Sequence, residues 1–398
     1  MDLSRDMSDE EIEALIGENA TLVLRGCPLS IRERVYIERQ VFNSLRKLDA
    51  LQELVDDPEV SEIMVNGPRN IFYEKEGRVY PWNQGFASEE KMQDVIQQIV
   101  GRHNRVVNLS NPIVDTRLAD GSRVNIVLSP ISLDGSSITI RKFPEHPLDM
   151  EALMEKDAIS REAAELLALL VEARYSILIS GGTGSGKTTF LNALSQYIPR
   201  EERVITIEDS AELQILGVKN LVRLETRNAN MEGVLPVTIR DLIRTALRMR
   251  PDRIVVGECR GAEAFDMLQA LNTGHDGGLS TAHGNSAGDI LSRLEMMVLM
   301  GMELPLAAIR QQIASGIDLI VHLGRLPDKS RRVLEITELD GIKEGEILLH
   351  PLYQLMQQED GWELVCVDSL RHKEKLAQAG LTERLPASRK AGGGDELL

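Results

Sequence analysis

The residues with the clearest chemical meaning form a glycine-rich segment between an apolar run and a helix-forming stretch. Residues 181–188 fit the pattern G-x-x-x-x-G-K-[ST]. Glycines let backbone N–H groups turn toward phosphate oxygens, and the following helix adds its positive N-terminal end. The lysine reaches the β and γ phosphates, and the next hydroxyl binds Mg²⁺. A plain glycine turn would need neither group, so we expect a site for ATP and Mg²⁺ formed by Gly181, Gly182, Thr183, Gly184, Ser185, Gly186, Lys187, Thr188 and Thr189, with Thr188 as a metal ligand.

Acidic residues end two other apolar runs. Residues 204–209 end in Glu208 and Asp209, and residues 253–258 end in Glu258. The carboxyl ends of parallel strands meet at one edge of a sheet, so we expect these acids beside the glycine-rich loop. Glu208 would orient the attacking water and Asp209 would contribute to the Mg²⁺ site, although Asp209 is equally suited to capping a helix that follows the strand. Glu258 is the expected base that polarises a water toward the γ phosphate.

Histidine and arginine residues complete the set of chemical candidates. His283 ends a further apolar run and is expected to hydrogen-bond a phosphate or sense its loss, whereas His275 suits a structural role in a loop. Two histidines eight residues apart, without a third ligand, do not indicate a metal site. Most exposed arginines are only surface charge, but a guanidinium from a neighbouring subunit often assists phosphoryl transfer. We select Arg223 and Arg227 for that role.

The elements that position these residues alternate regularly between apolar strands and amphipathic helices. This pattern predicts a largely parallel sheet covered on both faces, with ligands bound beyond the carboxyl ends of the strands. The expected strands span 177–180, 204–208, 220–224, 253–257, 279–283 and 318–323. The expected helices span 161–173, 188–196, 238–249, 262–271, 287–299 and 306–314.

The remaining regions suggest further domains. Residues 1–45 are expected to form a variable helical appendage. Residues 46–142 are expected to form an α+β domain with a hairpin turn at Glu76–Gly77. Two prolines place a linker at 143–150, ahead of the ATPase domain at 151–350, whose end resembles a hairpin at 331–339 and 346–350. Residues 351–398 form an extension whose polar, glycine-rich end is expected to be disordered.

Composition limits the classes of function. The chain has 398 residues and a formal net charge of -17, which repels polyphosphate backbones, so nucleic acid is not an expected partner. Its three cysteines show no C-x-x-C spacing, and no run approaches the ~18 to 20 apolar residues of a membrane span. A cytoplasmic protein that other molecules recruit to a membrane is expected.

Four motifs that follow the phosphate loop in order give the chain a specific resemblance. The phosphate loop, 205-ITIEDSAEL-213, 223-RLETR-227 and 248-RMRPDRIVVGE-258 occur in order, followed by 272-NTGHDG-277. Together they resemble the secretion-type ATPases of type II and type IV systems, and most nearly the tight-adherence (Flp-type) pilus assembly ATPases. Three positions depart from the family pattern: Ala282 stands where isoleucine is expected, Gly284 where alanine is expected, and Cys259 where an aliphatic residue is usual.

The resemblance implies a RecA-like α/β P-loop ATPase domain preceded by an α+β PAS-like N-terminal domain. It also implies that Glu208 and Asp209 form an Asp box, that Glu258 closes an atypical Walker B strand with Gly257 in place of the usual aspartate, and that His283 lies in a His box. A homohexamer with ATP between the two domains is expected.

The expected function is a cytoplasmic ATPase motor that drives pilus assembly or secretion through an inner-membrane platform protein, at the inner face of the membrane. A RecA-like nucleic-acid or conjugation motor is the alternative, and a regulatory module without turnover is a third hypothesis.

Overall fold

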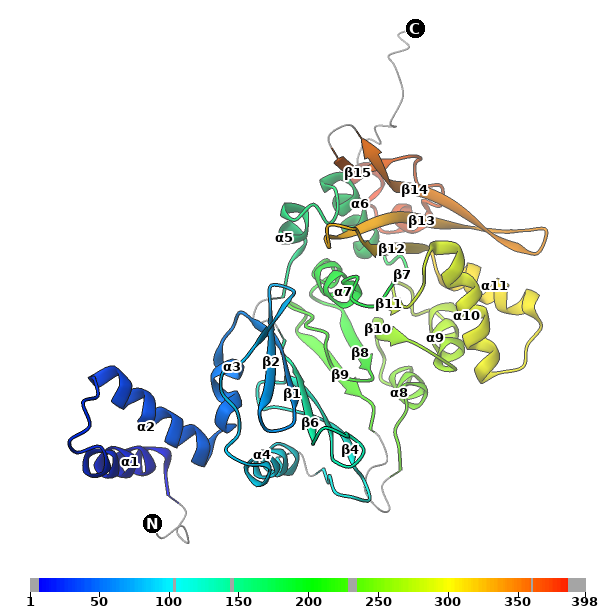
Figure 1. The fold of residues 1–398 in the computed structure, drawn as a ribbon. Coiled ribbons are helices and arrows are strands. Elements are labelled where there is room, and N and C mark those ends of the chain that lie inside the picture. The colour runs from blue at the N-terminus through cyan, green and yellow to red at the C-terminus, as the bar shows by residue number, and fades with distance from the viewer. Residues whose placement is uncertain (1–6, 103–104, 144–146, 228–234, 359–360, 386–398) are drawn as a thin grey trace. The chain divides into compact units, whose positions relative to one another are not determined.

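The structure is a computed structural model, and it describes residues 7–102, 105–143, 147–227, 235–358 and 361–385. The chain divides into two compact units, one within residues 7–143 and the other within residues 147–385 (Figure 1). Each unit has its own hydrophobic core. No described helix is long and apolar enough to cross a membrane.

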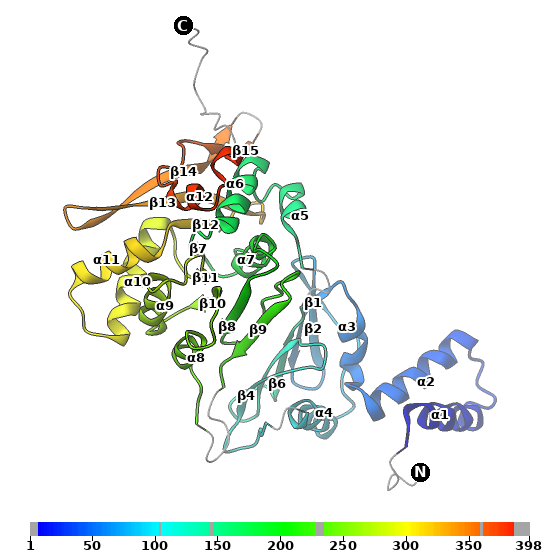
Figure 2. The ribbon, with the colours of Figure 1, turned by 180° about the vertical axis from the view of Figure 1, so that it is seen from behind.

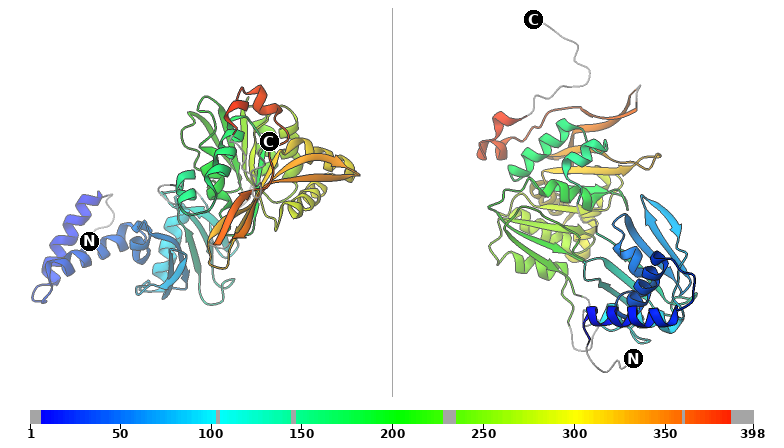
Figure 3. Two further views of the ribbon diagram at one scale, coloured as in Figure 1. Left: turned by 90° about the horizontal axis from the view of Figure 1, so that it is seen from above. Right: turned by 90° about the vertical axis from the view of Figure 1, so that its left-hand side faces the viewer.

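Two helices begin the first unit. Helix α1, Asp9–Val23, follows Ser8, and helix α2, Ile31–Arg46, follows Ser30. Each serine accepts a hydrogen bond from the backbone of the third helical residue, whose glutamate returns one to the serine's N–H. Such reciprocal capping satisfies two otherwise unpaired donors at each helix start. The two helices pack against each other (Figure 3), so the sequence break around Gly26 and Pro28 lies in the connecting loop.

An antiparallel six-stranded sheet forms the centre of the first unit. Buried residues alternate along four of its strands. Helices η1 (Asp49–Leu51), α3 (Gln52–Asp56) and α4 (Glu89–Gly101) supply covering apolar side chains. The expected hairpin turn is confirmed: Glu76 and Gly77 both have positive φ, 53° and 73°, as a two-residue hairpin turn requires. The strands in sheet order are β3 Arg78–Pro81, β2 Asn70–Lys75, β1 Val60–Asn66, β6 Ser137–Arg141, β5 Arg123–Val127 and β4 Ile113–Arg117.

A nine-stranded sheet forms the second unit. Six neighbouring strands are parallel, and all six correspond to expected strands. In sheet order they are β12 Leu319–Arg325, β7 Ile177–Gly181, β11 Leu279–Ala282, β10 Arg253–Cys259, β8 Arg203–Glu208 and β9 Asn220–Glu225. Antiparallel strands continue the sheet beyond β12: β13 Arg331–Lys343, β14 Glu346–Gln358 and β15 Gly361–Cys366.

Helices cover both faces of the parallel strands, as expected (Figures 1 and 2). Along β7, Ile177 and Ile179 belong to one core cluster and Leu178 to the other, because successive side chains point to opposite faces. The first cluster includes α5 Met150–Glu155, α6 Arg161–Glu172 and α7 Lys187–Ser195. The second includes α8 Ile239–Ala246, α9 Glu263–Asn272, α10 Ala287–Gly301 and α11 Leu306–Gly316.

The chain beyond residue 350 continues the second unit. The boundary expected at 350 falls inside β14, which forms a long hairpin with β13 (Figure 3). The chain that follows β15 is bound to β13. The buried Glu338 carboxylate of β13 accepts hydrogen bonds from the backbone N–H groups of Arg371 and His372, at 2.9 and 2.8 Å. The short α12 (Glu374–Gln378) and η2 (Thr382–Arg384) follow. The segment expected to be disordered, from residue 387, lies outside the described residues.

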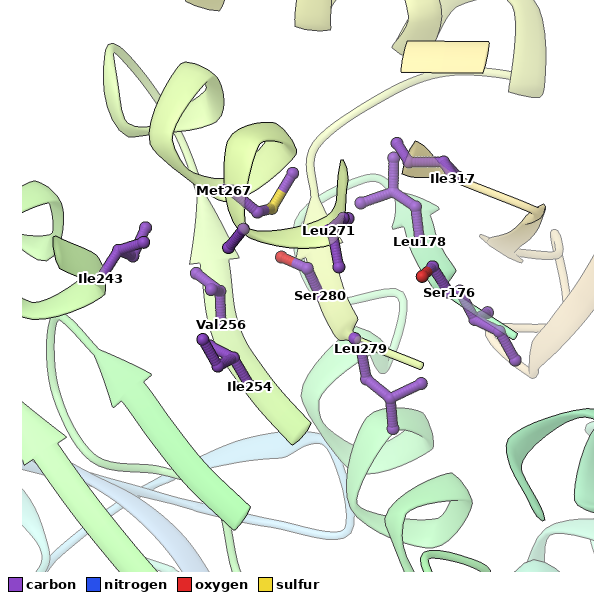
Figure 4. Close-up of a pocket in the computed structure, with 13 residues that line it drawn as sticks. Ser176, Leu178, Ile243, Ile254, Val256, Met267, Leu271, Leu279, Ser280 and Ile317 are labelled. Atoms are coloured by element: carbon purple, nitrogen blue, oxygen red, sulfur yellow. The ribbon is translucent and has the colours of Figure 1, made fainter. Parts of the chain in front are cut away.

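A small cavity lies within the second core cluster, between the strands and helices α8 and α9 (Figure 4). Its lining is apolar apart from Ser176 and Ser280, and it includes no charged residue. The lining residues of β7 and β11 come from the first halves of those strands, whereas the glycine-rich loop follows the end of β7. The cavity is therefore a gap in core packing and not the phosphate site.

Candidate functional site

The glycine-rich loop joins β7 directly to α7. Gly181 has φ 155°, and a Cβ there would lie 2.5 Å from the Leu323 carbonyl oxygen and 2.6 Å from Ser185 Oγ. Gly186, with φ 95°, precedes the first helical residue, Lys187. Side chains would therefore either clash or strain the backbone at these two positions. The loop conformation depends on the glycines of the motif.

The N-terminus of α7 is suited to bind an anion. No side chain caps it, and its first turn contains no acidic residue. Its N–H groups are therefore available to phosphate oxygens, and the helix dipole favours negative charge there. Ser185 Oγ is buried and has no hydrogen-bond partner among the described residues. These features fit the phosphate site that the sequence predicts, with Thr188 half-buried in the first turn.

The side chain of Lys187 contacts the backbone of its own loop. Its Nζ donates hydrogen bonds to the carbonyl oxygens of Gly181 and Gly182, at 3.1 and 3.0 Å, and lies 3.3 Å from His283 Nδ1. Burial lowers the pKa of the Lys187 ammonium, Arg260 lowers it further, and Glu258 opposes both effects. A phosphate would offer this ammonium stronger acceptors than two neutral carbonyls.

Glu258 and His283 extend this contact into a chain of neighbouring polar side chains. Glu258 is on β10 and His283 directly follows the neighbouring β11, so their side chains meet at the carboxyl ends of the strands. His283 Nε2 lies 2.8 Å from Glu258 Oε1, and Arg260 lies 2.6 Å from Glu258 Oε2. Burial and then Lys187 lower the pKa of His283, while Glu258 raises it. The structure thus brings Lys187, His283 and Glu258 together.

Arg260 is a member of this site that sequence reasoning missed. It follows Glu258 by two residues, a spacing that puts two side chains on the same side of an extended strand. That spacing was the available signal. A second missed arginine, Arg331 at the start of β13, has its Cδ 3.6 Å from the position of a Cβ on Gly186. No motif connects Arg331 with the loop, because the hairpin that carries it is far away in the sequence.

Glu208 lies inward and holds the loop after β8. Its side chain is buried, and Oε2 accepts hydrogen bonds from the backbone N–H groups of Glu212 and Leu213, at 2.6 and 2.8 Å. Burial raises the pKa of Glu208 to about 7, although these two hydrogen bonds oppose the rise. The catalytic role assigned to Glu208 stays a prediction. Its observed contacts are those of a loop-positioning group.

The position of Glu208 explains why β10 carries glycine where an aspartate is usual. A Cβ on Gly257 would lie 2.8 Å from Glu208 Cγ, because β8 and β10 are neighbours in the sheet. The glycine at 284, which stands where the family pattern has alanine, has a similar cause. A Cβ on Gly284 would lie 2.7 Å from Ser180 Oγ and 3.0 Å from Ile290 Cβ, so even the alanine of the family pattern would require a rearrangement here.

Glu208→Gln is expected to make the fold less sensitive to rising pH. Because the folded pKa of about 7 exceeds the ordinary 4.5, native Glu208 keeps its proton while the unfolded chain loses it. The wild-type protein therefore loses stability as pH rises from about 4.5 to 7, by on the order of 3 kcal/mol. Glutamine has no such loss. We expect denaturant unfolding to show that the free energy of unfolding of the variant, relative to that of the wild type, is higher at pH 8 than at pH 5. If the difference between the two proteins is the same at both pH values, the assignment is contradicted.

Asp209 and the predicted arginines lie at the edge of the sheet. Asp209 Oδ1 accepts a hydrogen bond from Thr226 Oγ1 at 2.7 Å, which ties the end of β8 to the residue after β9. Arg223 is exposed on β9, the edge strand, opposite Thr206. Arg227 is exposed and donates to the Leu235 carbonyl oxygen at 3.1 Å. Among the described residues, no hydrogen bond or ion pair joins these three to Lys187, His283 or Glu258, and their functional roles stay predictions.

Two other arginines, further along the chain from Arg227, have structural partners. Arg240 and Arg244 of α8 form ion pairs of 2.6 and 2.9 Å with the buried Asp266 of α9.

A histidine lies next to the strand that leads into the glycine-rich loop. The buried His322 of β12 lies 3.3 Å from Ser180 Oγ and supports the end of β7. Among the described residues, no group of three His, Cys, Asp or Glu side chains could hold a metal ion.

Comparison with known proteins decides the family. The family model of the Type II/IV secretion system protein matches residues 44–390. The chain belongs to this family. The resemblance to the type II and type IV secretion ATPases is thereby confirmed.

Curated relatives cover most of this member's length. It is 34% identical over 322 residues to the type IV secretion system protein PtlH homolog of Bordetella bronchiseptica, which covers 74% of this chain and 95% of the relative. It is 32% identical over 319 residues to the conjugal transfer protein TrbB of Rhizobium radiobacter, covering 79% and 94%.

Solved structures share the fold of this secretion family member. The Legionella pneumophila ATPase DotB matches with a TM-score of 0.53 and 23% identity over 76% of this chain and 82% of its own. The pilus retraction motor PilT with bound ADP matches with a TM-score of 0.51 and 19% identity, covering 85% and 88%. The mixed α/β class expected from the sequence is confirmed; at these identities the likeness concerns the fold alone.

Proposed function

We propose that this protein hydrolyses ATP at the end of β7 and uses the energy to drive a secretion or pilus assembly machine. The observation that carries the proposal is the chain from Lys187 through His283 to Glu258, which joins a phosphate-binding lysine to a carboxylate at an adjacent strand end. A site that only bound nucleotide would need no such carboxylate. Membership of the secretion family supports the same chemistry.

Each residue has a defined part in the proposed reaction. The loop N–H groups and Lys187 bind the β and γ phosphates, and Glu258 accepts a proton as water attacks the γ phosphorus. The bond from the γ phosphorus to the bridging oxygen breaks, which yields ADP and phosphate. His283 keeps Glu258 oriented and borders the phosphate. Thr188 and Asp209 would hold Mg²⁺, which supplies charge neutralisation on the phosphates when bound.

The arrangement of strands supports the more detailed fold assignment. In the second unit, β11 separates the loop strand β7 from the Glu258 strand β10, and β8 lies beyond β10. We assign this order to a RecA-like domain, and the antiparallel sheet with its covering helices to a PAS-like domain. The boundaries at 45, 142 and 150 stay predictions.

A ring of identical subunits would give the exposed arginines a function. Arg223 and Arg227 lie on or beside the edge strand, where a second copy of the chain could use them against its own bound nucleotide. We therefore propose a homohexamer that works in the cytoplasm at the inner face of the membrane and moves an inner-membrane platform protein. The tight-adherence pilus is the proposed setting.

ATP turnover by the purified full-length protein tests the proposal. We expect phosphate release that requires Mg²⁺ and stops on addition of EDTA, with Lys187→Ala as the control for contaminating ATPases. Specific activity should rise with protein concentration as a ring assembles. Nucleotide binding without turnover at any protein concentration would instead indicate the regulatory module.

A conjugation or nucleic-acid motor is the second candidate, because relatives such as TrbB are named for conjugal transfer. The net charge of -17 opposes long-range attraction to DNA. Stimulation of the ATPase by DNA, without stimulation by anionic lipid vesicles, would favour this candidate over the secretion motor.

A further inference from the structure

Arg260 occupies one oxygen of the proposed catalytic base. It lies 2.6 Å from Glu258 Oε2, while His283 lies 2.8 Å from the other oxygen. Arg260 is thus the cation paired with Glu258, because Oε1 is buried and accepts no hydrogen bond among the described residues even though His283 is nearby. A carboxylate in an ion pair is a weaker proton acceptor than a free one. Glu258 must lose its ion pair with Arg260 before it can act as a strong base on water.

The backbone that carries Arg260 is fixed. Glu263 Oε1 accepts hydrogen bonds from the backbone N–H groups of both Arg260 and Gly261, at 2.7 and 2.8 Å. The end of α10 packs against the next residue, since a Cβ on Gly301 would lie 2.7 Å from the Ala262 carbonyl oxygen. The guanidinium, in contrast, is on a side chain that is 61% exposed. Any movement of Arg260 is therefore confined to its side chain.

Several charges surround the Arg260 guanidinium. Besides Glu258, the acidic groups Asp209 and Glu212 stabilise its positive charge. Its own charge also acts on Lys187, the lysine that contacts phosphate. Two cations close enough to repel each other at the mouth of a phosphate loop are an arrangement that a polyanionic ligand stabilises.

We propose that Arg260 leaves Glu258 when ATP binds and makes a charge-assisted contact with the terminal phosphate. Glu258 is then free to accept the proton of the attacking water only when that phosphate is present. ADP lacks the terminal phosphate, so Arg260 stays on Glu258 and the site is inactive. This inference rests on the ATP hydrolysis proposed above and adds a residue that distinguishes ATP from ADP.

The test measures ATP and ADP affinity in a Glu258→Gln background. This background slows hydrolysis and removes the carboxylate that Arg260 contacts, so any remaining effect of Arg260 on ATP cannot come from freeing Glu258. Adding Arg260→Ala should weaken ATP binding by about tenfold or more and leave ADP binding unchanged. Arg260→Lys should have an ATP affinity between those of the arginine and alanine proteins, because lysine keeps the charge but not the planar guanidinium group. It also serves as the second variant if the alanine protein folds poorly.

Arg161→Ala is the matched control, since Arg161 forms an exposed 2.9 Å ion pair with Glu151 on α5 and α6. It should change neither affinity. If Arg260→Ala leaves ATP affinity unchanged in the Glu258→Gln background, or weakens ATP and ADP equally, the inference is overturned while ATP hydrolysis by the wild type still stands. If the wild-type protein binds no ATP, the proposed function and this inference are overturned together.

Discussion

Glu258→Gln is expected to bind ATP normally and to lower its turnover about 10²- to 10⁴-fold. Glutamine has nearly the same shape as glutamate, and its one amide oxygen can still accept a hydrogen bond from Arg260 or from His283, which lie beside the two carboxylate oxygens. It cannot accept the proton of the attacking water. The loss should therefore appear in kcat, with little change in the ATP dissociation constant.

Two measurements check this result. Fluorescent-nucleotide binding gives the affinity, and phosphate release at saturating ATP gives kcat. Glu303→Gln is the matched control, because Glu303 is an exposed carboxylate in the loop after α10 and should keep full activity. Near-normal turnover in Glu258→Gln would show that another group takes the proton, and Glu208 would then be the next candidate.

The sequence allowed the parallel strands and the phosphate loop to be predicted because both depend on local patterns. Ile177 to Ile179 are buried on both faces of the sheet, so they form a continuous apolar run, and the loop needs glycines at fixed places. The end of the second unit was harder to predict. Residues such as Leu352, Leu364 and Leu376 are buried, but they are too far apart to show a period, and the contact from Glu338 to Arg371 spans 33 residues.

The acids of the site show where sequence reasoning stops. Glu208 and Glu258 both end apolar runs, and nothing local distinguishes them. In the fold, Glu208 turns inward to the backbone of Glu212, whereas Glu258 meets His283 and Arg260. The deciding feature is Gly257, whose missing side chain leaves room for Glu208 from the neighbouring strand. Such a pair becomes visible only once the order of the strands is known.

Arg253→Met is expected to destabilise the second unit by about 3 to 5 kcal/mol, because it leaves a buried carboxylate without its partner. Arg253 is completely buried at the start of β10, and its guanidinium contacts both oxygens of Glu202, at 2.8 and 3.0 Å. It also donates to the carbonyl oxygens of Gly277 and Val171, at 2.7 and 3.1 Å. Denaturant unfolding measures the loss.

The double variant Arg253→Met with Glu202→Leu should recover most of that stability, since an apolar pair of similar volume replaces a buried ion pair at little net cost. Recovery should be incomplete, because the Gly277 carbonyl oxygen loses the donor that Arg253 supplies, whereas the Val171 carbonyl oxygen keeps the backbone N–H of Arg174. Arg161→Met, which breaks an exposed pair, should cost no more than about 1 kcal/mol. A double variant as unstable as the single one would mean that the carbonyl contacts, and not the ion pair, fix the start of β10. Because Glu258 lies near the other end of that strand, the recovered variant should also hydrolyse ATP, which separates the stability of β10 from its chemistry.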